Sequence, residues 1–217
     1  MPRPSQNLDV ALLQAGRELF VQTGAAGLSV RAVAERAGAN PGMFHYHFKT
    51  KENFLRTLLQ QVYEEIFEGL SGAAAQSGSA IDALRQVLEA AGALLVRHRR
   101  IFARVWMDAV AGEPVAVDFV RRNAPRHIGL LLGLVQQSQR DGSLRDLPPL
   151  QCVSMLMGAV ALPVIFVSGL VEVAMPQPAF QRQFGDQVMS EHAIAERVDL
   201  VLRALRATPA PRRKARA

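Results

Sequence analysis

Residues 28–52 read LSVRAVAERAGANPGMFHYHFKTKE and predict two short helices joined by a tight turn. Ser29 is a suitable N-cap for the first helix, because its hydroxyl can accept a hydrogen bond from a first-turn amide. Gly38 then supplies the left-handed backbone that ends this helix. Asn40 and Pro41 begin the second helix as its N-cap and first residue. The connection of about three residues is close to the length expected of a helix-turn-helix.

Helical periodicity continues on both sides of this stretch. Apolar residues within 8–20 recur at spacings of three and four, which places them on one face of a helix that ends at residues 23–24. Thr50 caps a further helix, whose apolar residues between 54 and 70 trace about five turns. Residues 71–79 are rich in Gly, Ala and Ser, and we expect them to end this helix and form a loop.

The rest of the chain predicts five more helices separated by proline and Asp-Gly turns. No stretch shows the alternating pattern of a strand, so the fold class is all-α. We expect a kink at Pro163 and a disordered tail after residue 207. The expected helices cover approximately residues 80–98, 100–111, 115–140, 149–171 and 188–206.

The net charge of +6 is unevenly distributed along the chain. Residues 1–54 carry six basic and four acidic groups, and residues 55–206 carry fifteen of each. The last eleven residues carry four basic groups. The overall charge is therefore weak evidence for a nucleic-acid partner, and that case depends on motifs.

Composition favours an intracellular chain with a substantial core. Hydrophobic residues make up 49% of the 217 residues. Cys152 is the single cysteine, which excludes an intramolecular disulfide framework and a cysteine-based zinc site. The first ten residues contain no apolar run followed by a cleavage site, so we expect no secretory signal and a cytoplasmic location.

One stretch permits a different interpretation. Residues 147–171 form a run of 25 uncharged residues, which is long enough for a membrane span. Basic groups lie on both sides of it, so no orientation satisfies the positive-inside rule. We favour a helix buried on most sides, for instance at a subunit interface, and keep a membrane-associated helical protein as the alternative.

The motif in residues 28–52 resembles the DNA-binding domain of the TetR family of repressors. The shared features are Ser before the first short helix, Val-Ala within it, Ala-Gly at its end, and a Tyr-x-His-Phe type signature followed by Lys-x-Lys-Glu. The resemblance covers roughly residues 8–55. His45 stands where the family usually has Tyr, and Tyr46 is displaced by one residue.

The resemblance implies three segments. Residues 8–54 would form a three-helix DNA-binding domain, residues 55–207 an effector-binding and dimerisation domain entered through a connecting helix, and residues 208–217 a basic tail. The implied protein is a homodimeric repressor that binds a palindromic operator in double-stranded DNA and is released by a small apolar effector. A transcriptional activator and a ligand-independent DNA-binding regulator remain alternatives.

The resemblance also implies which residues contact DNA. The helix beginning at Asn40 would enter the major groove, where its first turn can approach base edges without long side chains intervening. Asn40 could read an adenine edge, or it could bond only its own backbone as a cap. The base-reading residues would be Asn40, Pro41, Gly42 and Met43, and the phosphate contacts would come from Ser29, Arg31, His45, Tyr46, His47 and Lys51.

The larger domain would hold the effector and the dimer interface. The predicted helices 149–171 and 188–206 both carry apolar faces suited to pairing with a second subunit. For the effector residues, plain core packing is the alternative to a ligand pocket. The predicted effector pocket comprises Phe102, Trp106, Met107, Val110, His127 and Leu131.

The sequence does not predict an enzyme. It contains no nucleophile and base pair, carboxylate dyad or glycine-rich phosphate loop that would carry catalysis. His45 and His47 are two residues apart on a helix, point about 200° from each other, and have no Cys or carboxylate in register. We therefore expect no catalytic residues, no metal site and no cofactor.

Overall fold

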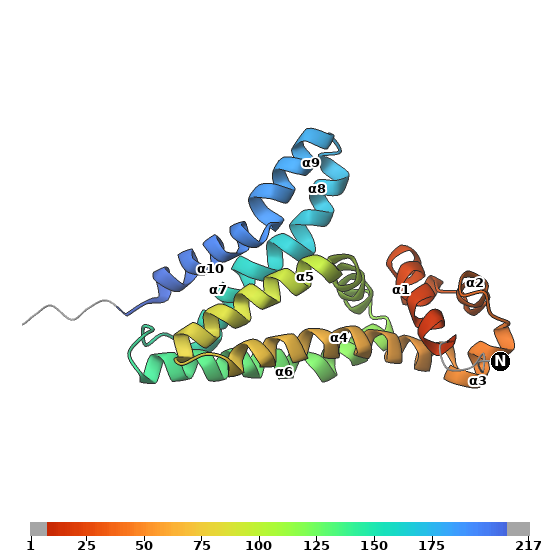
Figure 1. Ribbon diagram of the computed structural model, residues 1–217, viewed down its shortest axis with the longest axis horizontal. Coiled ribbons are helices and arrows are strands. Elements are labelled where there is room, and N and C mark those ends of the chain that lie inside the picture. The colour runs from red at the N-terminus through yellow and green to blue at the C-terminus, as the bar shows by residue number, and fades with distance from the viewer. Residues whose placement is uncertain (1–7, 208–217) are drawn as a thin grey trace, which may run out of the picture.

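The computed structural model describes residues 8–207, and this part of the chain is helical throughout apart from its turns (Figure 1). An isolated bridge between Leu144 and Arg206 is the only β-type pairing within the described range. The all-α prediction is confirmed. The elements are α1 (Leu8–Gly27), α2 (Val30–Arg36), α3 (Pro41–Phe48), α4 (Lys51–Ala75), α5 (Ala80–Val110), α6 (Pro114–Arg140), α7 (Pro149–Leu162), the π-helix η1 (Pro163–Val167), α8 (Ser168–Ala174), α9 (Pro178–Phe184), the π-helix η2 (Gly185–Met189) and α10 (Glu191–Leu205).

The helices form a small unit and a larger bundle (Figure 1). Helices α1, α2 and α3 pack on one another at one end of α4, and we call residues 8–48 the reading unit. Helix α5 packs against α4, α6, α7 and α10, so it is the central helix of the bundle. Helices α8 and α9 extend away from the bundle, whereas η1, which precedes them, packs against α5 and α7 (Figure 1). We call residues 163–184, comprising η1, α8 and α9, the apolar arm.

The helix starts within the motif follow the predicted caps. The Ser29 hydroxyl accepts from Ala32 N at 3.4 Å, and Asn40 Oδ1 accepts from Gly42 N at 2.8 Å. Thr50 accepts from the third residue of its own helix in the same way, at 3.1 Å. Gly38 has φ +65°, the left-handed conformation that ends α2. These side chains satisfy first-turn amides that would otherwise lack a partner.

Several predicted boundaries are wrong, each for a local reason. Helix α1 does not end at Gly24 but bends there (φ 68°, ψ −175°) and continues to Gly27. Helix α4 continues through 71–75, because alanine is the best helix former and no proline interrupts it. The predicted break near residue 99 is absent, and α5 is one helix of 31 residues.

Proline has two different effects in the C-terminal third. At Pro163, where we expect a kink, the α-helix α7 gives way to the π-helix η1, since proline has no N–H for the helical ladder. Pro178 starts α9, a helix that the sequence did not predict. The 26 residues from Pro149 to Ala174 are long and apolar enough to span a membrane, and one third of the most apolar window is buried within this chain. The predicted basic tail, residues 208–217, lies outside the described residues.

Candidate nucleic-acid interface

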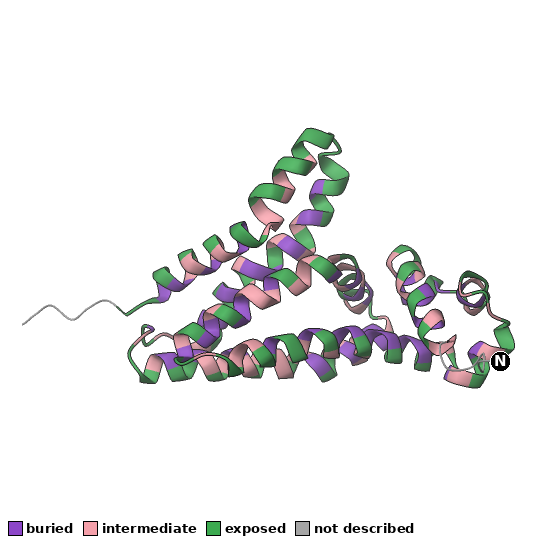
Figure 2. Cartoon of the chain, in the orientation of Figure 1, coloured by how far each residue is buried: buried purple, intermediate pink, exposed green. Residues whose placement is uncertain are grey.

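Helix α3 has one buried face and one exposed face. Phe44 and Phe48 are buried core residues, and their rings lie 4.9 Å from that of Phe54 on α4. Pro41 and Gly42, in the first turn, are exposed. The aromatic face fixes the orientation of α3 on the reading unit and leaves its N-terminal turn accessible (Figure 2).

Asn40 acts as the cap of this turn. Its side-chain oxygen accepts from Gly42 N at 2.8 Å, which is the capping role that the sequence left open against base reading. Met43, the third residue of α3, is half-buried. The predicted base-reading residues therefore occupy one contiguous, largely exposed turn.

The predicted phosphate-contacting residues lie around the same turn, on α2, α3 and the start of α4. Arg31 and Tyr46 are exposed, and Tyr46 retains 67% of its accessible surface. The His45 ring nitrogen Nδ1 lies 3.1 Å from the carbonyl oxygen of Lys49, and His47 is half-buried. Ser29 is exposed beside Arg31 at the start of α2.

Two lysine side chains near this turn donate to backbone carbonyl oxygens of the same chain. Lys51 Nζ donates to the carbonyl oxygen of Ala26 at 2.8 Å, so this ammonium joins α4 to the end of α1. Lys49 ends α3 with φ 65°, donates to the carbonyl of Tyr46 at 3.0 Å, and is exposed. Lys49 is not among the predicted DNA contacts, although it directly precedes Thr50, the N-cap of α4, and this position could have indicated it.

The predicted effector residues divide into two groups, so the six do not lie together. Trp106, Met107 and Val110 are exposed on the last turns of α5. Trp106 and Val110 line an open hollow of about 320 Å³ against α6. Phe102 is partly buried and packs against the core. The hollow is completed by Ala109, Val117, Val120 and Arg121.

Leu131 belongs instead to the helical core, and His127 lies half-buried between α4 and α6. Leu131 is buried, and the His127 Nδ1 lies 3.4 Å from the hydroxyl of Tyr63 on α4. Tyr63 donates that hydroxyl to the carbonyl of Asn123 at 2.8 Å. Burial lowers the pKa of His127 and raises the pKa of Tyr63, because each charged form would lose its hydration. This cluster joins the connecting helix α4 to α6.

A contact between the reading unit and α5 was not predicted. The buried carboxylate of Asp108 accepts from Ala25 N at 2.9 Å and pairs with Arg104 Nε at 3.0 Å. Arg104 also donates to the carbonyl of Thr23 at 3.4 Å. Gly24 has φ 68° and ψ −175°, a conformation that is essentially restricted to glycine, and a Cβ there would also force the Arg104 guanidinium, 2.1 Å away, to move. The partners are 83 residues apart, and no local pattern indicates such a contact.

Comparison with known proteins finds relatives of the helix-turn-helix segment. Residues 12–58 match the model for "Bacterial regulatory proteins, tetR family". The HTH-type transcriptional repressor Rv3405c of Mycobacterium tuberculosis is 30% identical over 115 residues, which is 53% of each chain. The match thus spans about half the length of this curated relative. The HTH-type transcriptional repressor KstR2 of Mycolicibacterium smegmatis is 24% identical over 136 residues, which cover 62% of this chain and 66% of the relative.

Solved structures share the fold over nearly the whole chain. The ketosteroid transcriptional regulator KstR2 of M. tuberculosis superposes with a TM-score of 0.69 at 17% identity, over 92% of this chain and 95% of its own. FadR of Bacillus subtilis, in complex with stearoyl-CoA, gives 0.64 at 16% identity, over 84% and 98%.

A capped helix-turn-helix on an all-helical bundle is the arrangement that this chain shares with transcription regulators of known structure. Residues 12–58 are therefore a DNA-binding domain of the TetR family, and the fold of nearly the whole chain is similar to that of solved TetR-family structures.

Proposed function

We propose that this protein is a cytoplasmic repressor that binds a palindromic operator as a homodimer and is released by a small apolar effector. The observation that carries the proposal is the first turn of α3, which is exposed above a buried aromatic face. Such a turn can enter the major groove, with Pro41 and Gly42 near base edges. Arg31, Tyr46 and Lys51 would hold the flanking phosphates, together with Ser29, His45 and His47.

Dimerisation is supported by the apolar arm. Leu170 and Val173 are 66% and 82% exposed, and the preceding Leu162 and Phe166 are 50% and 40% exposed. An apolar face of this kind is unusual on a monomer and suits pairing with a second copy. Pairing would fix the two α3 helices about one DNA turn apart, which a palindrome requires. The same face would suit a membrane surface, so the oligomeric state is the discriminating measurement.

The effector is proposed to occupy the hollow lined by Trp106 and Val110. The lining is mostly apolar, with Val117 and Val120 from α6, and Arg121 is its only charged member. Met107, one residue from Trp106, is a flexible side chain suited to an adaptable wall. Two fold relatives support the ligand class, since one is a ketosteroid regulator by name and the other holds stearoyl-CoA.

The signal would pass through α5 to the reading unit. Asp108 lies between Trp106 and Val110 in sequence and bonds to Ala25 N near the end of α1. An occupant that displaces this end of α5 would therefore move α1 and, with it, α3. A coupling free energy of about 1–3 kcal/mol would weaken operator binding by roughly 5- to 150-fold.

The experiment uses full-length protein and the DNA next to its own coding region. We expect a palindrome there to bind with a steep salt dependence, and long-chain acyl or steroid compounds to weaken this binding. Asp108→Ala should retain ligand binding and lose most of the ligand's effect on DNA, whereas the control Asp118→Ala, on α6, should retain it. A monomeric chain without salt-sensitive DNA binding would refute the proposal.

A further inference from the structure

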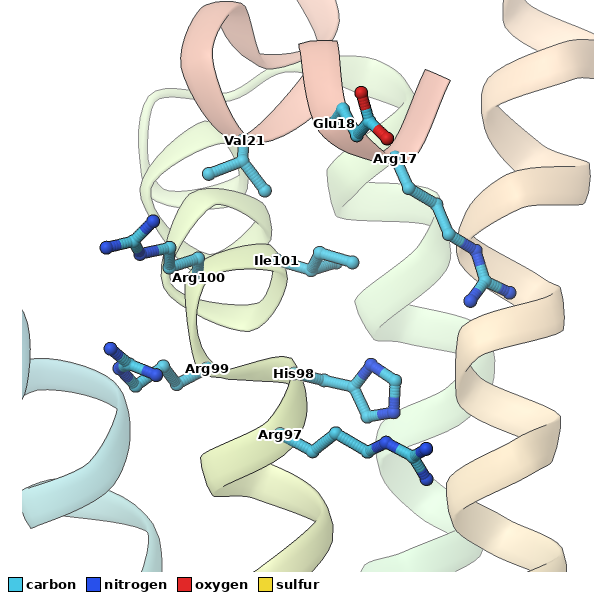
Figure 3. Close-up of a pocket in the computed structure, with 8 residues that line it drawn as sticks. All are labelled: Arg17, Glu18, Val21, Arg97, His98, Arg99, Arg100 and Ile101. Atoms are coloured by element: carbon cyan, nitrogen blue, oxygen red, sulfur yellow. The ribbon is translucent and has the colours of Figure 1, made fainter. Parts of the chain in front are cut away.

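A second hollow lies at the junction of the reading unit and the bundle. It has a volume of about 460 Å³ and is lined by α1 and by residues 97–101 of α5. Figure 3 shows that Arg17, Arg97 and His98 project to one side of α5, whereas Arg99 and Arg100 project to the other. It does not share a lining residue with the hollow at Trp106.

The cations on the α4 side have only loose partners. Arg17 and Arg97 both approach Glu65, with nitrogen-to-oxygen distances of 3.9 and 3.6 Å. Arg17 also donates to the side-chain oxygen of Gln61 at 3.4 Å. These distances exceed the usual 2.7–2.9 Å of a charge-assisted hydrogen bond. One carboxylate therefore serves two guanidinium groups, and neither guanidinium has a close bond to it.

On the other side of α5, two guanidinium groups again share one carboxylate. Arg99 and Arg100 share Glu172, at 3.1 and 3.8 Å. Glu18, the acidic residue of the lining itself, is engaged by Arg36 at 2.7 Å. Four guanidinium groups thus share two carboxylates, which leaves an excess of two positive charges around the hollow.

His98 adds a buried polar atom without a partner. Its side chain is 9% exposed, and Nε2 makes no hydrogen bond within the described residues, although Glu65 Oε1 lies 3.5 Å away. Figure 3 shows the imidazole on the same side as the Arg17 and Arg97 guanidinium groups. A buried nitrogen of this kind is costly unless a ligand or water bonds to it.

We propose that this hollow binds the phosphate group of a small metabolite, held by Arg17, Arg97 and His98. A phosphate monoester carries a charge of about −1.5 to −2 near pH 7. Arg17 and Arg97 share the single carboxylate of Glu65, which leaves one positive charge on this side of α5 to attract such a group. Guanidinium forks bind phosphate oxygens in a bidentate manner, and the His98 nitrogen supplies a further bond. The hollow is large enough for an organic phosphate.

The position of the hollow gives this site a regulatory consequence. Arg17 belongs to α1 of the reading unit, whereas Arg97 and His98 belong to α5 of the bundle. A phosphate bonded to both would join the two parts directly. Binding would change the orientation of the reading unit independently of any apolar effector. The proposed phosphate site does not depend on the proposed repressor function.

The test measures binding of pyrophosphate and glycerol 3-phosphate to the full chain by calorimetry at constant ionic strength. We expect binding to weaken at least tenfold in Arg97→Ala and partly in Arg97→Lys, which retains the charge but loses the fork. Arg97 is largely exposed, so its removal should not prevent folding. Arg182→Ala, on exposed α9, removes the same charge elsewhere and should leave binding unchanged.

Two results would overturn the proposal. Equal weakening in Arg97→Ala and Arg182→Ala would show general screening rather than a site. Tighter binding of succinate than of either phosphate compound would contradict the assignment to phosphate in favour of a dicarboxylate.

Discussion

The reading unit and the apolar arm differ in how far their apolar residues are buried. In the reading unit, Phe20 and Phe44 are fully buried, and α2 and α3 begin at side-chain caps. In the arm, α9 has no buried residue, and none of its three helical elements starts with a side-chain cap. Figure 2 shows this contrast as mostly exposed residues along α8 and α9.

The contrast separates a region whose apolar residues are largely covered within one chain from a region that leaves large apolar side chains exposed. Side chains of the reading unit cap the starts of α2 and α3, and α4 of the same chain completes its core where Phe54 meets Phe44 and Phe48. The arm leaves an apolar face that only a second surface can cover. Its stability should therefore depend on association, while that of the reading unit should not.

The largest expected effect comes from placing charge on the arm. Leu170→Glu combined with Val173→Glu would bury two unpaired carboxylates in a subunit interface. We expect dimerisation to weaken at least about 100-fold, roughly 2.8 kcal/mol, as measured by sedimentation at micromolar concentration. The reading unit should retain its helical signal.

Val10→Glu provides the matched control, because Val10 is an exposed apolar residue on α1. It should leave the oligomeric state unchanged. A double arm variant that remains dimeric would contradict the contrast between the two regions.

Sequence predicted the reading unit well because its signals are local. Ser29, Gly38, the Asn40-Pro41 pair and Thr50 each determine a helix end through a bond or conformation within three residues. Boundaries were less accurate where residues have no strong local preference. The Arg99-Arg100 pair contains no helix breaker, and tertiary packing allows α5 to continue through it.

Sites built from distant segments were not predictable in this way. Trp106 and His127 both lie on helix faces that the pattern predicts to be apolar. In the packed structure, however, His127 contacts Tyr63 on α4, and Trp106 lies at an open hollow. The Asp108 contact with Ala25 depends on how two helices cross. A pattern identifies which face of a helix is apolar, and only the packed structure determines what that face meets.

A second prediction concerns the bundle between the two regions. Burial lowers the pKa of His127, so the folded chain binds fewer protons than the unfolded chain just below the ordinary value of 6.5. The free energy of unfolding should therefore fall as pH falls below about 6.5. Denaturant titrations between pH 7.5 and pH 5, chosen to bracket the ordinary histidine pKa, would measure this loss.

His127→Gln should reduce that acid sensitivity, since the variant has no imidazole to protonate. The matched control is His192→Gln, because the side chain of His192 is 85% exposed. It should retain the full pH dependence. An unchanged pH profile in His127→Gln would assign the acid loss to other groups.

The smallest expected effect separates the two roles of Asn40. Asn40→Ala removes the bond to Gly42 N and should lower the free energy of unfolding by about 1 kcal/mol. Asn40→Asp keeps an acceptor at the cap and favours the helix N-terminus, so stability should be retained. Its new charge would face the phosphates of bound DNA, and operator affinity should fall although folding does not. Equal operator affinity in Asn40→Asp and the unaltered chain would show that the first turn of α3 does not lie against DNA.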